Sequence, residues 1–167
     1  EAIDEVPEIT TQYFFNTASE WYYMTSGYTD EDFPADDWMT NAEVYGTWET
    51  ANADLGQKGS NVWDTSEDEF AIGNKGIWAV KEFTVEDVEA IADWSLMTSM
   101  FFDDNIHVYI NGKEVFTHAT WNNGHELYKL VEEAGSVLKD GTNVIAAHLW
   151  QGHGGYAFDM SLYATAD

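Results

Sequence analysis

The sequence predicts an all-β domain, and three observations lead to that prediction. Val108 and Ile110 alternate with polar neighbours, and Asn111-Gly112 follows at once, which is the strongest short-range signal of a β-hairpin. Further runs of strand-forming residues recur at short spacing, with glycine-containing turns between them. No stretch shows helical periodicity beyond about two turns. We therefore expect a β-sandwich that folds on its own.

Length and composition agree with one domain that spans residues 1–167. A chain of 167 residues is long enough to bury roughly 70% of the surface that it exposes when unfolded. Its 8 Trp, 9 Tyr and 9 Phe are too many for a disordered chain. The sequence starts at Glu1 without a signal peptide. We expect it to be an extracellular module of a longer, secreted protein.

The charge balance points to an uncharged partner. Thirty-one acidic residues stand against six basic ones, all of them lysines, and give a formal charge of −25. Because nucleic acids and anionic lipids bind through Lys and Arg, this surface should repel both. The absence of arginine also removes the usual fork for carboxylate and phosphate ligands. No apolar run approaches the ~20 residues of a membrane span, so we expect no membrane insertion.

The N-terminal half is expected to begin with an aromatic strand and a long irregular region. Residues 12–25, dense in Tyr, Phe and Trp, predict one strand. Gly27, Pro34 and five carboxylates predict a loop over residues 26–37. Residues 38–74 lack clear periodicity, and a loop region of that length is usually functional or contains short strands.

The middle of the chain is expected to alternate strands with one short helix. Residues 76–83 and 94–102 predict strands. Between them, Thr84-Val85-Glu86-Asp87 resembles a helix capping box, so residues 85–92 are expected to form two helical turns. The hairpin over residues 106–116 follows. Its turn should be of type I′, because Asn-Gly tolerates positive φ at both central positions.

The C-terminal part is expected to complete the sandwich. Residues 127–138 fit either a strand or a short helix. Asp140-Gly141 predicts a turn into a clear strand over residues 143–150. A glycine-rich loop covers residues 152–155, and residues 156–163 predict the last strand.

Two segments resemble a known family, the galactose-binding-like jelly-roll domain. They are Val108-Tyr109-Ile110-Asn111-Gly112-Lys113-Glu114-Val115 and Leu138-Lys139-Asp140-Gly141-Thr142-Asn143-Val144-Ile145-Ala146. Ile77-Trp78 with Glu82-Phe83-Thr84-Val85 is similar to the strand that opens the family's core. Such domains occur at the front of many glycoside hydrolases and in carbohydrate-binding modules. The resemblance covers residues 21–162 and implies a jelly-roll sandwich of two antiparallel sheets, with binding residues on variable loops.

The motifs of common enzymes do not occur in the sequence. There is no Gly-x-Ser-x-Gly elbow, phosphate-binding loop or His-Glu-x-x-His. With 31 carboxylates, a pair at the glycosidase spacing of ~5–9 Å is expected by chance and discriminates nothing. The sequence has no cysteine, which excludes disulfides, thiolate metal sites and a cysteine nucleophile. We therefore expect a domain without catalytic activity.

Two loops combine the groups that a carbohydrate site needs, namely flat rings for the apolar faces of sugars and polar groups for their hydroxyls. Each loop places a tryptophan and a histidine beside glycine and an amide side chain. The first loop supplies Trp121, Asn122, Asn123 and His125, and the second supplies Trp150, Gln151, His153 and Tyr156. The alternative is that the two tryptophans plug the ends of the sandwich.

A strand face offers a second candidate surface. If Ile145, Ala147 and Leu149 point inward, His148 and Trp150 point outward. There they would join His107 and Tyr109 from the hairpin in one aromatic, imidazole-bearing platform. The alternative is that a loop covers this face. Four tryptophans in or beside strong strand patterns are expected in the core: Trp21, Trp38, Trp78 and Trp94. Trp48 and Trp63 fit either location.

Asp159 is a candidate ligand for a structural calcium ion. It lies in the last predicted strand, where modules of the resembled family often place such a ligand near the N-terminal segment. Calcium takes six to eight oxygen ligands, which an acidic chain can supply. We expect calcium to stabilise the fold without being required for sugar binding; the alternative is an ordinary exposed carboxylate.

The favoured interpretation is a non-catalytic carbohydrate-binding module of a secreted, multimodular polysaccharide-degrading enzyme. Its ligand would be a neutral glycan, with xylan or another β-linked plant polysaccharide preferred, and its partner a catalytic domain in the same chain. Such a module raises the local concentration of the enzyme on its substrate. The alternatives are a structural jelly-roll that packs against a catalytic domain without binding sugar, and a protein–protein adhesion module with an exposed aromatic patch.

Overall fold

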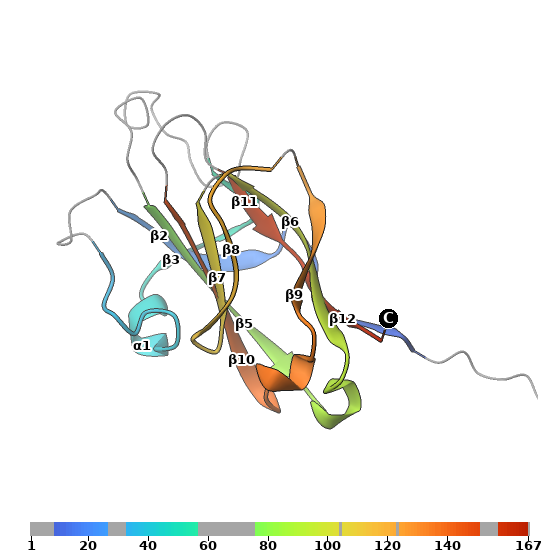
Figure 1. Cartoon of the computed structure of the whole chain (residues 1–167). Helices are drawn as coiled ribbons and strands as arrows, with labels where there is room; N and C mark the ends of the chain where they lie inside the picture. Colours follow the sequence, from blue (N-terminus) through green and yellow to red (C-terminus); the bar gives the residue numbers. More distant parts are fainter. Residues whose placement is uncertain are drawn as a thin grey trace, which may run out of the picture.

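The computed structural model is a sandwich of two antiparallel β-sheets, which confirms the predicted all-β fold class (Figure 1). It describes residues 9–26, 33–56, 76–103, 105–122, 124–150 and 157–166. The first sheet, called sheet A, contains β1 (Thr11–Phe15), β4 (Leu55–Gly56), β6 (Ser95–Asp103), β9 (Glu126–Val131), β11 (Ala157–Met160) and β12 (Leu162–Thr165).

The second sheet, called sheet B, has the strand order β3-β2-β5-β10-β7-β8. Its members are β2 (Glu20–Ser26), β3 (Glu49–Asn52), β5 (Gly76–Val85), β7 (Ile106–Ile110), β8 (Lys113–His118) and β10 (Gly141–Trp150). Short helical turns add to the described strands: α1 (Ala42–Tyr45), η2 (Glu89–Ile91) and η3 (Ala134–Ser136).

Strand β6 is the centre of sheet A. It pairs with β9 on one side and with β11 and β12 on the other. Strands β11 and β12 follow one another along β6 and pair outward with β4 and β1. In sheet B, β10 pairs along its whole length with β5, and its other edge pairs with β7.

The central hairpin forms as predicted. Strand β7 ends at Ile110 and β8 begins at Lys113, with φ of 49° at Asn111 and 82° at Gly112. Positive φ at both central residues is the signature of the type I′ turn. The side chain of Asn111 donates to the carbonyl oxygen of Val137 and accepts from the N–H of Val144. The hairpin is therefore fixed to the end of β10 as well as to its own turn.

The main core lies between the sheets and contains the inward residues of both. Val108 and Ile110 of β7 are fully buried, as are Ile145 and Leu149 of β10, in agreement with the alternation seen in the sequence. Trp21 lies at the centre of this core, where its ring meets that of Phe158 edge to face at 5.1 Å. Aromatic pairs of this geometry stabilise beyond the area that they bury.

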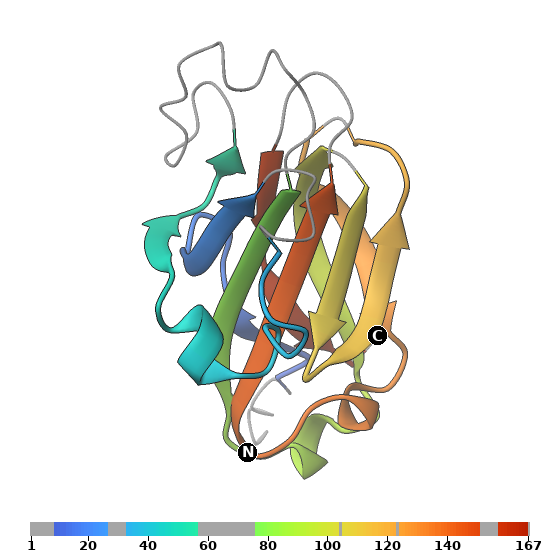
Figure 2. The same ribbon diagram turned by 90° about the vertical axis from the view of Figure 1, so that its left-hand side faces the viewer.

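A second, smaller cluster covers the outer face of sheet B. Residues 33–48, which include α1 and are called the strap from here on, run across that face (Figure 2). Trp38 and Tyr45 of the strap are buried against Trp78 and Val80 of β5 and Ala146 of β10. The hydroxyl of Tyr45 donates to Glu82 at 2.5 Å, which adds one polar tie between the strap and β5.

The structure corrects three sequence predictions. Residues 156–163 predict one last strand, but the described residues form β11 and β12, with Ser161 between them. Residues 12–25 are two strands rather than one, because a turn with Ala18 at φ 61° sends β1 into sheet A and β2 into sheet B. The helix over residues 85–92 is absent; Val85 is the buried last residue of β5, and only the η2 turn follows. Burial of Val85 opposite Gly141 outweighs the local capping pattern.

The tryptophans predicted as core are buried or half-buried. Trp21, Trp38 and Trp78 are nearly inaccessible to solvent, although Trp38 and Trp78 belong to the second cluster, and Trp94 packs against the main core. The ambiguous residues 127–138 contain the end of β9 and the η3 turn. In the described part of the chain, no helix is long and apolar enough to cross a membrane.

Candidate functional site

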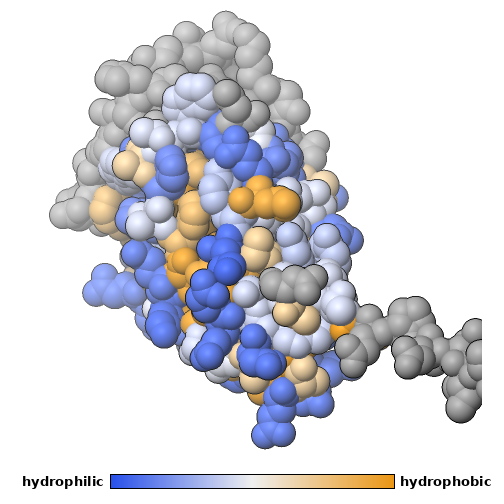
Figure 3. All heavy atoms as spheres, turned by 45° about the vertical axis from the view of Figure 1, so that its right-hand side comes forward, coloured by the Kyte–Doolittle hydropathy of each residue, from blue (hydrophilic) through white to orange (hydrophobic). Residues whose placement is uncertain are grey.

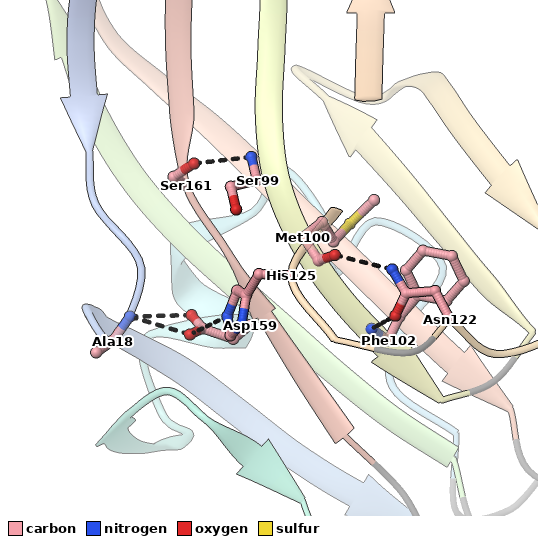
Figure 4. A network of polar contacts seen from close by, with 8 residues as sticks. All are labelled: Ala18, Ser99, Met100, Phe102, Asn122, His125, Asp159 and Ser161. Atoms are coloured by element: carbon pink, nitrogen blue, oxygen red, sulfur yellow. Dashed lines mark hydrogen bonds and ion pairs between the residues drawn. The ribbon is translucent and has the colours of Figure 1, made fainter. Parts of the chain in front are cut away.

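Residues 119–122 and 124–125, called the Trp121 loop, present an exposed tryptophan beside an asparagine that is bonded to β6. The Trp121 residue is 56% exposed, whereas its neighbour Asn122 is buried. The Asn122 side chain donates to the carbonyl oxygen of Met100 at 2.9 Å and accepts from the N–H of Phe102 at 3.0 Å (Figure 4). Its own N–H donates to the carbonyl oxygen of Phe102 at 3.1 Å. Asn122 therefore attaches the loop to β6 and leaves Trp121 facing solvent.

His125 fixes the other end of the Trp121 loop. Its Nε2 lies 2.9 Å from Oδ2 of Asp159, and its ring centroid is 5.9 Å from that of Phe101 on β6. The His125 side chain is 42% exposed, so one side of the ring is available to a ligand. Asp159 also accepts from the N–H of Ala18 at 3.0 Å. The carboxylate thus joins the Trp121 loop and the β1–β2 turn to β11 (Figure 4).

The placement of Asp159 bears on the predicted calcium site. The residue is buried rather than exposed, and it does lie beside the N-terminal strands. The Asp159 carboxylate acts on Asp54, whose pKa is raised first by burial and further by Asp159. Among the described residues, no group of three or more His, Asp or Glu side chains is arranged to hold a metal ion. Two carboxylates alone do not supply the six to eight oxygens of a calcium site, and calcium binding stays a prediction.

The outer face of sheet B holds the second predicted surface, and the strap covers part of it. His148 stacks on Trp78 with ring centroids 4.4 Å apart. The ring of Trp38 from the strap meets the imidazole edge to face, with centroids 6.5 Å apart. Phe33 meets Trp150 edge to face at 5.5 Å. The structure therefore shows the alternative in which a loop covers the platform, and Trp150 is half-buried within an aromatic cluster.

His148 is held in its neutral form by this environment. Its Nε2 atom is buried and has no hydrogen-bond partner among the residues that the structure describes. Burial, and secondarily the neighbouring imidazole of His107, lowers the pKa of His148 to about 4. Desolvation disfavours the charged form of a buried base, which accounts for this direction.

His107 and Tyr109 lie on the same face, nearer to solvent. The Nδ1 atom of His107 is 3.1 Å from Oε2 of Glu114 and 3.3 Å from Oγ1 of Thr117. In a catalytic relay the two ring nitrogens of a histidine bond different partners. Here Glu114 and Thr117 both meet Nδ1 of His107, so the imidazole does not link them in that way. Tyr109 contacts the edge of Trp38 with centroids 6.4 Å apart, so its ring also forms part of the cluster under the strap.

Several predicted residues lie outside the described part of the chain. These are Asn123, Gln151, His153 and Tyr156 from the two loops, together with Trp63. Trp48, for which either location was open, belongs to the strap and stacks on Trp38 with centroids 6.0 Å apart. The structure thus brings Trp121 and His125 together in one loop and places His107, Tyr109, His148 and Trp150 on the opposite side of the sandwich.

A polar hollow of about 220 Å³ lies beside β2, away from both predicted surfaces. Lys81 lines it, donates to the carbonyl oxygen of Glu20 at 2.9 Å and lies 5.2 Å from the Phe15 ring. Burial lowers the pKa of Lys81, with an opposing influence of Glu20. The ammonium group thus joins β5 to the start of β2.

Sequence reasoning missed the outer face of sheet A. Tyr13 is 57% exposed and Leu127 is 68% exposed, and the ring of Tyr13 stacks on that of Tyr163 with centroids 4.9 Å apart. The alternation of exposed and buried residues along each strand was visible in the sequence. The sequence does not show which strands are neighbours or which residues pair across them, and this register is what brings Tyr13 beside Tyr163.

Comparison with solved structures places the fold among domains of glycoside hydrolase family 2 enzymes, while no protein-family model and no curated protein sequence matches the chain. A β-glucuronidase from an uncultured Clostridium species superposes with a TM-score of 0.63 and 15% identity, over 98% of this chain and 30% of that one. A family 2 glycosyl hydrolase from Bacteroides cellulosilyticus gives 0.63 and 15%, over 94% and 21%. The β-glucuronidase of Ruminococcus gnavus gives 0.60 and 12%, over 98% and 30%.

The chain therefore spans less than a third of the length of each of these enzymes. Identities of this size establish a shared fold and leave function to be argued from the residues of the site.

Proposed function

We propose that the chain is a non-catalytic, extracellular accessory domain of a glycoside hydrolase and that it binds a neutral polysaccharide through the Trp121 loop. Xylan or another β-linked plant glycan is the preferred ligand. The observation that carries the proposal is the exposure of Trp121 on a loop attached to β6 by Asn122 and to β11 by His125. A large exposed ring on a backbone held by its neighbours is suited to stacking on a sugar.

The chemistry of the loop suits a neutral sugar. The Trp121 ring offers a flat apolar surface, and the half-exposed imidazole of His125 offers a hydrogen-bonding group for a hydroxyl. Because the loop is already held by hydrogen bonds, little conformational entropy is lost when a ligand binds. The formal charge of −25 without arginine opposes anionic ligands.

The comparison with larger enzymes supports an accessory role. The same fold occurs there as a part of glycoside hydrolase chains, so a catalytic domain in the same polypeptide is the natural partner of this chain. A tethered domain that holds polysaccharide raises the local concentration of substrate at the catalytic domain.

Affinity electrophoresis against a panel of neutral and acidic polysaccharides tests the proposal, with calorimetry on those that retard the protein. Trp121→Ala should lower the affinity by about 2 kcal/mol, roughly thirty-fold, because stacking area is lost. Phe33→Ala is the matched control, since Phe33 is a 40% exposed aromatic residue that packs on Trp150 on the opposite side of the sandwich. Wild-type protein that binds none of the panel, or Trp121→Ala that binds like wild type, would contradict the proposal.

A further inference from the structure

The register of sheet A places a row of mostly uncharged side chains across its outer face, with one lysine at its end. Tyr13 of β1 pairs with Tyr163 of β12, and Tyr163 pairs with Met97 of β6. Met97 in turn pairs with Lys129 of β9. Side chains at paired positions lie on the same face of a sheet, about 4.5–5.5 Å apart. The row therefore crosses the full width of the sheet.

Two further rows run parallel to the first. Ser99 pairs with Leu127, and its carbonyl oxygen accepts from the N–H of Ser161. Phe101 pairs with Asp159, which His125 covers from the Trp121 loop. Outward positions of β6 thus read Met97, Ser99, Phe101 and Asp103, whereas the alternate residues Leu96, Thr98, Met100 and Phe102 are buried. The rows connect the tyrosine pair at one end with the Trp121 loop at the other.

These rows carry almost no free charge. The Lys129 ammonium lies 3.2 Å from Glu132, and the Asp159 carboxylate is buried against His125. The remaining members are aromatic, aliphatic or hydroxyl side chains, in a chain where 31 of 167 residues are acidic. In Figure 3, which brings this side forward, near-neutral and hydrophobic surface lies beside strongly hydrophilic side chains. A sheet face with so few charged side chains, namely Lys129, Asp159 and Asp103, on so acidic a protein favours an uncharged partner.

We propose that the outer face of sheet A extends the Trp121 site into a platform for an extended, unbranched neutral glycan several sugar units long. This inference rests on the proposed function and adds the shape of the ligand to it. The stacked rings of Tyr13 and Tyr163 offer a flat apolar area at the far end, and the hydroxyl side chains of Ser99 and Thr165 lie among the rows. Rings interspersed with hydroxyls match the alternating apolar faces and hydroxyl edges of a sugar chain.

The dimensions of the platform decide how many sugars it holds. Four residues separate Met97 from Phe101 along β6, which is about 13 Å at the rise of a strand. An extended sugar chain laid along this length of about 13 Å covers roughly three units, and the Trp121 loop adds about one more. A second copy of the chain is a poorer occupant, because two molecules of formal charge −25 would face each other.

Calorimetry with xylo-, cello- and manno-oligosaccharides of roughly two to six units tests the platform. For the series that binds, affinity should rise with length and level off at about four units. Tyr163→Ala should lower the affinity for the long oligosaccharides about tenfold and leave that for the shortest unchanged. Tyr163→Phe keeps the ring and should bind like wild type. Trp121→Ala should weaken the binding of every length.

Each other outcome overturns a distinct part of the reasoning. Affinity that is independent of length and insensitive to Tyr163→Ala, but lost in Trp121→Ala, confines the site to the loop and removes the platform alone. Failure of every oligosaccharide and polysaccharide to bind removes the proposed function together with the platform. A wild-type dimer in light scattering that Leu127→Glu dissociates would assign the face to a second copy of the chain and would also overturn the platform.

Discussion

Mild acid should lower the free energy of unfolding through one buried imidazole, that of His148, at pH values where most carboxylates are still ionised. His148 stacks on Trp78 under the strap, and burial lowers its pKa to about 4 from the ordinary 6.5. Since the unfolded chain takes up a proton near pH 6.5 and the folded chain does not, the free energy of unfolding falls as the pH drops from about 6.5 to about 4. The contribution of neutral His148 to the free energy of unfolding is fully present above about pH 6.5, and it is lost below the pKa of about 4 in the folded protein.

The size of the effect follows from the displacement of the pKa. A displacement of about 2.5 units corresponds to about 3 kcal/mol in total, at 1.36 kcal/mol per unit. Between pH 7 and pH 5, where most carboxylates are still ionised, about 2 kcal/mol of this should be lost. His148→Phe keeps a ring on Trp78 and removes both the titration and the buried, unpaired Nε2 atom. At pH 7 the variant should therefore be at least as stable as wild type.

Urea unfolding followed by tryptophan fluorescence measures this directly. Free energies of unfolding are collected from about pH 7 to about pH 5 for wild type, His148→Phe and His118→Phe. His118 lies on the exposed edge strand β8 and controls for the loss of one imidazole. The wild-type curve should fall by about 2 kcal/mol more than that of His148→Phe across this range. Parallel curves for these two proteins would refute the account of His148 as a neutral, buried base.

Other measurements probe the remaining features. Trp150→Ala should destabilise the fold by about 2–3 kcal/mol, because the ring packs between Phe33 and Trp78, whereas Trp121→Ala should cost less than about 1 kcal/mol in urea unfolding; equal losses would mean that Trp121 is a core residue. Affinity for a bound polysaccharide should change less than about tenfold between low and moderate salt, since a neutral glycan has no counterions to release, and a steeper dependence in calorimetry would indicate a charged ligand. Excess calcium should raise Tm relative to chelator if a metal binds the native state near Asp159, and identical Tm values would exclude that site.

Much of the fold could be predicted from neighbouring residues. The Asn111-Gly112 turn could be predicted because two adjacent residues that tolerate positive φ meet its backbone requirements. The alternation along β7 and β10 likewise shows which side chains point inward, because successive residues of a strand face opposite sides. The charge of −25, and with it the preference for an uncharged ligand, needs no structure at all.

Local patterns misled where contacts between distant segments outweighed them. The capping pattern after Thr84 predicts a helix, but Val85 gains more by completing β5 opposite Gly141. The aromatic run over residues 12–25 reads as one strand, yet the turn at Ala18 divides it between the two sheets. Propensity is a weak preference of at most about 1 kcal/mol per residue, and burial in the sandwich exceeds it.

The candidate site was decided at the level of tertiary structure. Sequence alone singled out Trp121 and His125, because a tryptophan, an amide and a histidine beside glycine are the groups that bind sugar. It could not show that the strap covers His148, that Asp159 holds both His125 and Ala18, or that Tyr13 stacks on Tyr163. All four contacts join residues that lie between 34 and 150 positions apart in the sequence. Which face is covered depends on the register and order of strands, and these are set by the packing of the whole core.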